Sequence, residues 1–325
     1  MSKRRHAERR QVAHPAQRQR PTQDARGPQR SRTTDQGRPG TAADRRPLVL
    51  GVLVVVIVAV AGIAFLLRPG GSAATAWTRL GTEDVHALTF VDDDPQRLLF
   101  GHHGGILASE DGGRTWTALG TNSDAMGLAA GGANGAGSIV IAGHLVLIES
   151  RDGGRSWSSI PADLPDLDIH GFTRDPADPN RMWAYLAIGG LWESSDGGRA
   201  WERVHDGNVV HPIAVAAPGG TRLYGVTTAG PSRSDDGGRT WAAIGSPDLF
   251  PLASLAATPD GSVLVAGGPD GLARSDDGGM TWRMLAFQGE PASVAVARGG
   301  STIAVVTRST EFYRSDDGGS SWPGP

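Results

Sequence analysis

The sequence predicts an all-β, six-bladed β-propeller that is preceded by one transmembrane helix and a disordered basic tail. Three observations indicate this organisation. An eight-residue motif, S-x-D-G-G-x-[TSA]-W, occurs six times from Ser109 onward, and its aspartates recur every 40 to 44 residues. A period near 40 with strand-like content is typical of propeller blades. Ahead of the repeats, residues 48–67 contain no charged side chain.

The first segment, residues 1–46, is predicted to be disordered. It carries 13 lysines and arginines against four acidic residues and has few large apolar side chains. Such a segment buries too little surface to offset its chain entropy. A solvated cytoplasmic tail that sets membrane topology is favoured over a segment that binds nucleic acid or anionic lipid, because basic runs alone are weak evidence.

The second segment, residues 47–67, is predicted to be a transmembrane helix. Twenty uncharged residues span about 30 Å, which is about the thickness of the hydrocarbon core. The apolar run and the segment before it are both longer than those of a signal peptide. Arg45 and Arg46 flank its start and only Arg68 its end, which predicts a cytoplasmic N-terminus and an extracytoplasmic remainder. Cleavage near Ser72–Ala74 is the alternative.

Residues 68–76 are predicted to be a linker, and residues 77–325 the propeller. Each repeat is expected to form four antiparallel strands, three before the motif and a fourth that begins at its tryptophan. In the first repeat the initial three are residues 85–90, 98–101 and 106–109. The chain contains no cysteine, so packing alone must hold an extracytoplasmic domain together. Residues 68–325 carry no basic, aromatic-rich surface typical of nucleic-acid binding.

The two ends of the propeller are predicted to meet. Only three residues follow Trp322, so the sixth repeat lacks its fourth strand. The sequence WTRLG at Trp77 resembles WTALG at Trp116 and can supply that strand. Such closure removes the two exposed sheet edges that an open ring would leave.

The repeated motif itself is predicted to be structural. A short aspartate side chain can accept backbone N–H bonds in a tight turn, and the glycine pair permits positive φ. The tryptophan then covers the turn. The aspartates and tryptophans assigned to this role are Asp111, Asp152, Asp196, Asp236, Asp277, Asp317, Trp116, Trp157, Trp201, Trp241, Trp282 and Trp322.

The motif resembles the Asp-box, or BNR repeat, of sialidases, other glycosyl hydrolases, sortilin-type receptors and photosystem II assembly factors. The stretch HALTFVDDDPQRLLFGHHGGILASEDGGRTW is similar to bacterial membrane-associated proteins labelled as BNR glycosylhydrolases. The six copies of the motif run from Ser109 to Trp322, so the resemblance covers most of the predicted propeller. The resemblance implies a sialidase-like propeller that binds ligands at one mouth of its central channel, with the motifs away from that mouth. A shared fold does not carry its function with it.

Candidate ligand-binding residues occupy equivalent positions on the predicted innermost strands and at the ends of the second strands. The innermost strands place three histidines and a methionine at one position, with aspartates two residues earlier. The second strands add two histidines eight residues before their motif aspartates, with His102 adjacent, and Arg308 is also expected at this mouth. The full set is Asp84, His86, His102, His103, Asp124, Met126, His144, Asp168, His170, His211 and Arg308.

Two interpretations of the histidines remain open. Imidazole binds zinc, copper and nickel, and thioether favours Cu(I), so a copper or zinc site is one interpretation. Its predicted ligands are His86, His103, His144, His170 and His211. Alternatively, the histidines on the innermost strands alternate in phase with apolar residues and are structural groups between blades, bonded to backbone carbonyls.

The predicted function is a membrane-anchored, extracytoplasmic binding or scaffold module for a protein partner, a glycan or a metal. The alternative is a glycoside hydrolase, with no catalytic residue assigned, and this requires two carboxylates about 5–9.5 Å apart. Sialidase chemistry is disfavoured, because the arginine triad of that family is not recognisable. The chain has three tyrosines, and none is predicted to lie at the channel.

Overall fold

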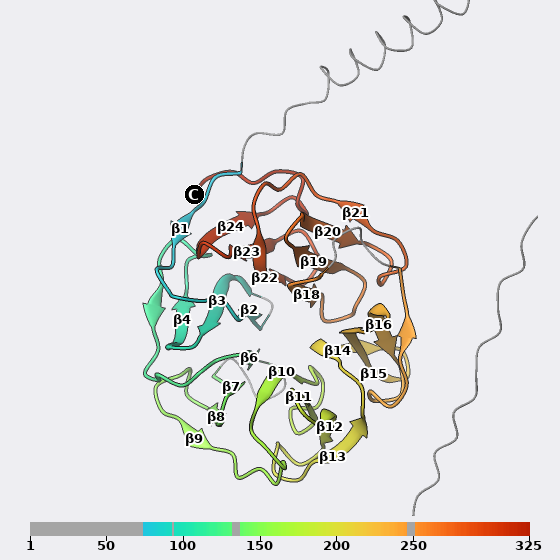
Figure 1. The fold of residues 1–325 in the computed structure, drawn as a ribbon. Helices are drawn as coiled ribbons and strands as arrows, with labels where there is room; N and C mark the ends of the chain where they lie inside the picture. Colours follow the sequence, from blue (N-terminus) through green and yellow to red (C-terminus); the bar gives the residue numbers. More distant parts are fainter. Residues whose placement is uncertain (1–73, 93, 132–136, 246–250) are drawn as a thin grey trace, which may run out of the picture. The chain divides into compact units, whose positions relative to one another are not determined.

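The computed structural model describes residues 74–325, except residues 93, 132–136 and 246–250. These residues form six four-stranded antiparallel sheets arranged around a central axis (Figure 1). The sequence-predicted six-bladed, all-β propeller is therefore confirmed. The predicted tail, membrane span and most of the linker lie outside the described residues. Within the described part of the chain, no helix has the length and apolar character needed to cross a membrane.

Blades 1 to 3 follow the chain in order, and each runs from an inner to an outer strand. Blade 1 contains β2 (Ala87–Val91), β3 (Asp94–His102), β4 (Gly105–Ser109) and β5 (Thr117–Ala118). Blade 2 contains β6 (Gly127–Ala130), β7 (Ile139–Gly143), β8 (Val146–Ser150) and β9 (Ser158–Ser159). Blade 3 contains β10 (Ile169–Arg174), β11 (Met182–Leu186), β12 (Gly190–Ser194) and β13 (Glu202–His205).

Blades 4 to 6 repeat this order, but the outer strand of the last blade comes from the other end of the propeller. Blade 4 contains β14 (Val210–Ala217), β15 (Gly220–Thr227), β16 (Gly230–Ser234) and β17 (Ala242–Ala243). Blade 5 contains β18 (Ser254–Ala257), β19 (Leu264–Gly268), β20 (Gly271–Ser275) and β21 (Arg283–Met284). Blade 6 contains β22 (Pro291–Val296), β23 (Ile303–Thr307), β24 (Glu311–Ser315) and β1 (Thr78–Arg79).

The ring closes through β1, as the sequence predicts. Strand β1 pairs antiparallel with β24, and Thr78 lies opposite Phe312. The backbone N–H of Trp77 donates to the carbonyl of Phe312 at 2.8 Å, and that of Leu80 donates to the carbonyl of Thr310 at 2.8 Å. In Figure 1 the first strand of the propeller lies beside β24, one of its last. Closure thus covers the edge that β24 would otherwise expose.

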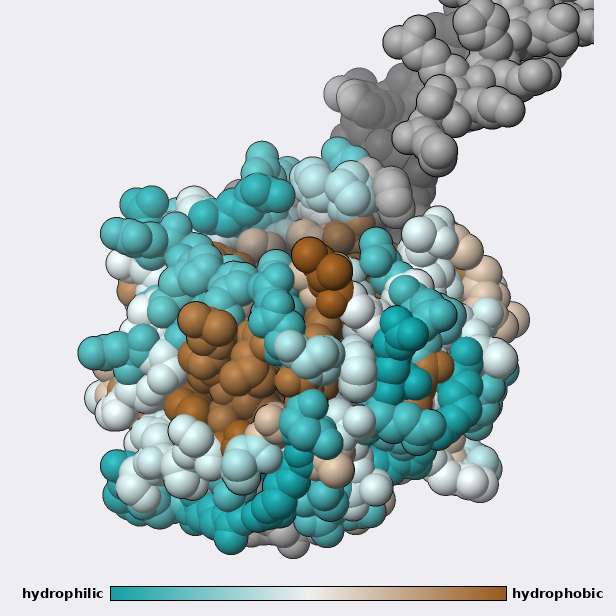
Figure 2. Space-filling model, turned by 60° about the horizontal axis from the view of Figure 1, so that its bottom comes forward, coloured by the Kyte–Doolittle hydropathy of each residue, from teal (hydrophilic) through white to brown (hydrophobic). Residues whose placement is uncertain are grey.

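The hydrophobic core lies between neighbouring blades. One cluster joins blades 1 and 6, and it includes Phe90 and Phe100 from one blade and Val306 and Phe312 from the other. Strand β7 is buried at all five positions, as expected for a strand covered on both faces. The surface in Figure 2 is largely hydrophilic, and its exposed hydrophobic residues gather mainly in one patch.

The six Asp-box turns share the hydrogen bonds of their serine and aspartate, which supports a structural role, whereas the indole N–H of Trp322 in the sixth turn has no hydrogen-bond partner among the described residues. In the first, Asp111 Oδ1 accepts the backbone N–H groups of Arg114 at 3.1 Å and Thr115 at 2.9 Å. Gly112 and Gly113 have φ values of 76° and 98°. The indole N–H of Trp116 donates to the carbonyl of Gly113 at 3.0 Å.

The serine of the motif also takes part in the turn, a role that its sequence pattern does not reveal. Ser109 Oγ donates to Asp111 Oδ1 at 2.9 Å and accepts the buried N–H of Gly113 at 2.8 Å. The turns also contact the start of the second strand of their blade, since the N–H of Gly112 donates to the carbonyl of Gln96 in β3. They therefore lie at the opposite ends of the strands from the candidate mouth.

Candidate metal centre

Seven predicted residues form a continuous row at one mouth of the channel, across blades 1 to 3. Three aspartates lie just before the inner strands, two histidines follow the second strands, and two histidines lie at the start of inner strands. We call this set the His–Asp row: Asp84, His86, His103, Asp124, His144, Asp168 and His170. Antiparallel pairing places the start of a first strand beside the end of a second strand, which is why these segments meet.

Backbone contacts fix the aspartates at the start of the first two blades. Asp84 Oδ1 accepts the backbone N–H of His103 at 2.9 Å, and Asp124 Oδ2 accepts that of His144 at 3.1 Å. Asp168 instead forms a β-bridge with His144 of the preceding blade. The row therefore passes from blade 2 to blade 3 through His144.

Three ligand atoms at the blade 2–blade 3 junction form a nearly equilateral triangle. His144 Nε2 lies 3.3 Å from His170 Nε2 and 3.4 Å from Asp168 Oδ1. His170 Nε2 lies 3.0 Å from the same carboxylate oxygen. We call these residues the third-blade triad. Their side chains are 36–42% exposed, so the triangle is open to solvent.

Asp124 holds the imidazole of His144 in one orientation. Its Oδ2 lies 2.6 Å from His144 Nδ1. Because an ionised carboxylate only accepts hydrogen bonds, Nδ1 carries the proton and Nε2 of a neutral ring has a free lone pair. A carboxylate bonded to the distal nitrogen of a metal-binding histidine is a recurring feature of metal sites. The Asp124 side chain is only 12% exposed.

A second group of ligand atoms lies in blade 1, and we call Asp84, His86 and His103 the first-blade triad. His86 Nε2 is 3.0 Å from His103 Nδ1 and 3.5 Å from Asp84 Oδ1. The second oxygen of Asp84 contacts His103 Nδ1. The imidazoles of His103 and His144 are parallel, with ring centroids 5.9 Å apart, and so join the two triads.

Electrostatics differ between the two histidines of the first-blade triad. Burial lowers the pKa of His86 below its usual value, against the attraction of Asp84. A hydrogen bond with Asp84 raises the pKa of the exposed His103. Burial raises the pKa of Asp84, but hydrogen bonds from the backbone and side chain of His103 outweigh it, and the net shift is downward. The aspartate is thus ionised at neutral pH.

Irregular pairing positions two of the channel histidines. The register between β10 and β11 shifts at His170, and that between β14 and β15 shifts at His211 and Pro212. His211 also has a positive φ of 52°. Bulges turn side chains away from the regular alternation of a strand. The alternative prediction, that His170 is buried between blades in phase with Phe172, is therefore wrong, because His170 is exposed at the mouth.

Four candidates lie outside the row. His102 stacks on Phe100 and accepts the N–H of Gly104 at 3.1 Å. Arg308 lies 3.9 Å from Glu290 as an exposed ion pair. Met126 and His211 line the channel but belong to neither triad. Among the five predicted metal ligands, the structure therefore brings four histidines together and leaves His211 apart.

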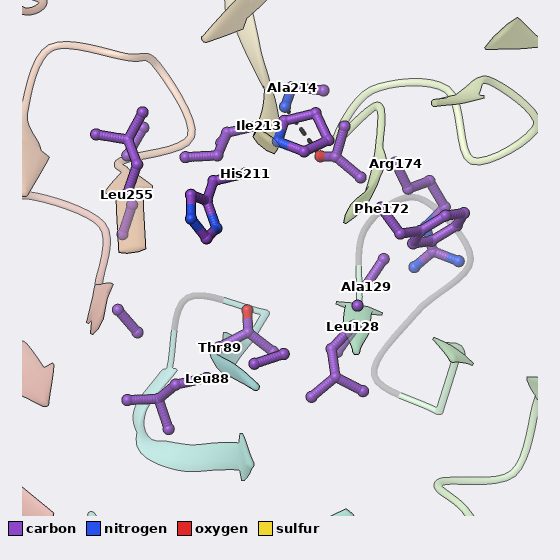
Figure 3. Close-up of a pocket in the computed structure, with 18 of the residues that line it drawn as sticks. Leu88, Thr89, Leu128, Ala129, Phe172, Arg174, His211, Ile213, Ala214 and Leu255 are labelled. Atoms are coloured by element: carbon purple, nitrogen blue, oxygen red, sulfur yellow. Dashed lines mark hydrogen bonds between the residues drawn. The ribbon is translucent and has the colours of Figure 1, made fainter. Parts of the chain in front are cut away.

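The channel beside the row encloses a cavity of about 320 Å³. Inner strands from all six blades line it, and Leu88, Leu128, Ile213 and Leu255 are among the lining residues (Figure 3). The ring of His211 also points inward, and burial lowers its pKa to about 4. His211 is therefore neutral at physiological pH. All three tyrosines are described, and none lines this cavity.

The charged residues that line the cavity beyond the mouth were not singled out from the sequence. Arg174 is buried, and its guanidinium donates to Ser138 Oγ at 2.8 Å and to the carbonyl of Gly131. Burial lowers its pKa. These contacts tie blade 3 to blade 2. An arginine at the end of an inner strand carries no local sequence signal for such a role.

Comparisons with known proteins show similarity of fold. No protein-family model and no curated protein matches the chain. Among solved structures, a GH74 xyloglucanase from Xanthomonas campestris has a TM-score of 0.52 and 21% identity, covering 77% of this chain and 46% of that enzyme. The GH74 enzyme of Niastella koreensis has a TM-score of 0.51 and 17% identity, covering 74% and 46%. The chain thus spans less than half of either enzyme.

YCF48 from Cyanidioschyzon merolae has a TM-score of 0.49 and 18% identity, over 77% of this chain and 88% of that protein. The likeness to the two GH74 enzymes agrees with the propeller fold that the Asp-box resemblance implies. The chain is a six-bladed β-propeller that carries six Asp-box turns.

Proposed function

We propose that this protein is a membrane-anchored, extracytoplasmic binding module that holds a transition-metal ion, zinc by its geometry, at the third-blade triad. The observation that carries the proposal is the triangle formed by His144 Nε2, His170 Nε2 and Asp168 Oδ1, with sides of 3.0, 3.3 and 3.4 Å.

The size of this triangle supports zinc. Ligand bonds of about 2.0–2.1 Å in a tetrahedral site place any two ligand atoms about 3.3–3.4 Å apart. Square-planar copper would instead bring neighbouring ligands to about 2.8 Å at a bond length near 2.0 Å. Two imidazoles and one carboxylate occupy three positions. The fourth is left for water or for an exchangeable ligand, as in catalytic zinc sites.

A purely structural hydrogen-bond network explains the triangle less well. Two imidazole nitrogens that face each other at 3.3 Å can share only one proton. His144 Nδ1 already donates its proton in a hydrogen bond to Asp124, and Asp168 Oδ1 competes as acceptor for a proton on His170 Nε2. A cation at the centre satisfies all three atoms at once. The open coordination position also offers an attachment point for a glycan or protein ligand.

Metal titration tests the proposal directly. Full-length chain is purified in detergent without a histidine tag, stripped with EDTA, and titrated with Zn²⁺ and Cu²⁺ by calorimetry, with bound metal counted by mass spectrometry. We expect zinc retention in the wild-type chain and loss of the triad ion in His170→Ala. His205→Ala is the matched control, because His205 lies in β13 on the outer edge of blade 3. Equal zinc binding in all three chains would overturn the assignment.

The glycoside hydrolase alternative is tested with xyloglucan and a panel of aryl glycosides. The GH74 likeness is one of fold, and we expect no turnover from the zinc-loaded or the metal-free chain. Hydrolysis that is lost in Asp84→Asn or Asp168→Asn would replace the binding module with a hydrolase.

The membrane topology rests on the uncharged run of residues 48–67 and the arginines before it. Because the chain lacks cysteine, single-cysteine variants report the side of the membrane. A membrane-impermeant maleimide should label Met280→Cys in intact cells, since Met280 is 59% exposed on the propeller. It should label Ser31→Cys only after lysis. The reverse pattern would contradict the proposed orientation.

A further inference from the structure

We infer that the His–Asp row holds a second metal ion, bound by the first-blade triad of Asp84, His86 and His103. This inference rests on the proposed function and extends it from one ion to two. The two sites would lie side by side along the same mouth.

The first-blade triad repeats the chemistry of the third-blade triad. In both, an aspartate lies two residues before a histidine of the same innermost segment, as D-V-H at Asp84 and D-I-H at Asp168. In both, the second imidazole comes from the residue after a second strand, His103 or His144. Two imidazoles and one carboxylate are thus supplied in each case.

The two triads also share their geometry. The imidazole planes of His86 and His103 are inclined by 83°, and so are those of His144 and His170. The facing ring nitrogens are Nε2 of His86 and Nδ1 of His103 in the first pair, 3.0 Å apart, and two Nε2 atoms in the second pair, 3.3 Å apart. The converging nitrogens point at one position, where in the first pair an ion displaces the proton that His103 Nδ1 donates to Asp84. Such convergence is what a shared cation requires.

The structure supports two ions and not three. The residues between the triads, His103, Asp124 and His144, also approach one another. However, Asp124 is bonded to Nδ1 of His144, and Nε2 of the same ring belongs to the third-blade triad. Blade 2 carries Met126 where blades 1 and 3 carry their D-x-H histidine. Its aspartate therefore orients a ligand of the neighbouring site.

The pocket geometry distinguishes the first-blade site in one respect. His86 is more enclosed than the other histidines of the row, with a side chain only 17% exposed, whereas His103 is 53% exposed. An ion bound there contacts solvent from the side of His103. We therefore expect the first-blade ion to exchange more slowly with chelators than the third-blade ion, which all three of its ligands leave accessible.

Counting bound zinc in matched variants tests the inference. Four full-length, untagged chains are compared with wild type: His86→Ala, His170→Ala, the double variant and the control His205→Ala. The expected stoichiometries are two ions for wild type and the control, one for each single variant, and none for the double variant. Circular dichroism and melting of the metal-free chains check that each variant folds, and His86→Gln repeats the test with a side chain closer in size.

The possible results separate this inference from the proposed function. One ion in wild type that is lost in His170→Ala but kept in His86→Ala would overturn the second site alone. No bound zinc in wild type would overturn both. Two ions that persist in the double variant would also overturn both, because the zinc would then be bound elsewhere. X-ray absorption of each single variant should show two imidazoles on its remaining ion, and fewer would contradict the assigned ligands.

Discussion

At the scale of single residues, three aspartates at equivalent positions have different roles. Asp84 and Asp168 each lie within 3.5 Å of an imidazole nitrogen that faces a second imidazole. Asp124 contacts only the Nδ1 side of His144 and accepts the backbone N–H of the same residue. It is therefore a positioning residue, whereas its counterparts supply ligand oxygens.

Replacing Asp124 should weaken metal binding without removing a ligand. Loss of a carboxylate that orients a metal-binding histidine typically lowers affinity 10- to 100-fold. We expect zinc affinity to fall about 10-fold in Asp124→Asn, which can still accept the Nδ1 proton, and about 100-fold in Asp124→Ala. Calorimetric titration checks this order. If Asp124 had only a structural role, both variants would lower the melting temperature of the metal-free chain, and their zinc affinities would not differ in this order.

The sequence predicted which residues of the row lie close together. It did not predict which of them supply ligand atoms and which only orient a ligand. Alignment of the repeats places His86 with His170 and His103 with His144, because every blade has the same strand order. The alignment cannot show which ring nitrogen faces a neighbour. It also missed the bulges at His170 and His211, since these depend on pairing with the adjacent strand and not on local composition.

At the scale of elements, the Asp-box turn depends on its serine as much as on its aspartate. In the fifth box, Ser275 Oγ donates to Asp277 Oδ1 at 2.8 Å and accepts the N–H of Gly279 at 2.8 Å. Ser275 is buried. Its hydroxyl therefore satisfies a buried N–H that water cannot reach.

Removing this hydroxyl should destabilise the propeller. Leaving a buried N–H without a partner costs about 1–3 kcal/mol, so we expect Ser275→Ala to lower the free energy of unfolding by that amount. Met280→Ala in the same turn is the control, because its side chain is exposed. Urea unfolding followed by tryptophan fluorescence measures both. Equal stability of the two variants would contradict the role assigned to Ser275.

The same turns predict loss of stability in acid. Hydrogen bonds from a neighbouring threonine or serine side chain, and from backbone N–H groups, lower the pKa of Asp111, Asp152 and Asp277 to about 2. An unfolded aspartate has a pKa near 3.9. A lowered pKa in the folded state stabilises the protein above pH 4, and this contribution is lost as the pH falls from about 4 through 2.

The acid dependence is checked with Asp277→Asn. At pH 7 the variant should be less stable than wild type, because it lacks the charged acceptor of the turn. Below pH 2 the difference should shrink, since the wild-type aspartate is then protonated as well. Urea unfolding at a series of pH values gives both curves. A stability difference that stays constant from pH 7 to pH 2 would show that the carboxylate charge does not contribute.

At the scale of the whole molecule, closure of the ring depends on a few residues at its start. The sequence predicted this closure from a missing strand in the last repeat and an extra tryptophan segment before the first. The structure adds that Trp77 packs edge-on against Phe312 and donates from its indole N–H to the carbonyl of Pro323 at 2.7 Å. The short strand β1 is therefore anchored by side chains as well as by its backbone.

Breaking one backbone bond of this closure should open the ring. Leu80→Pro removes the N–H that donates to the carbonyl of Thr310, whereas Leu80→Ala keeps that bond and loses only side-chain contacts. We expect the proline variant to melt at a lower temperature than the alanine variant and to form larger species in gel filtration, because a released β1 exposes the edge of β24 to other chains. The two triads lie in blades 1 to 3, away from the β1–β24 pair in blade 6. Zinc stoichiometry of the remaining monomer should therefore stay at the wild-type value. If zinc binding is lost when the ring opens, the metal sites depend on the closed ring and not only on blades 1 to 3.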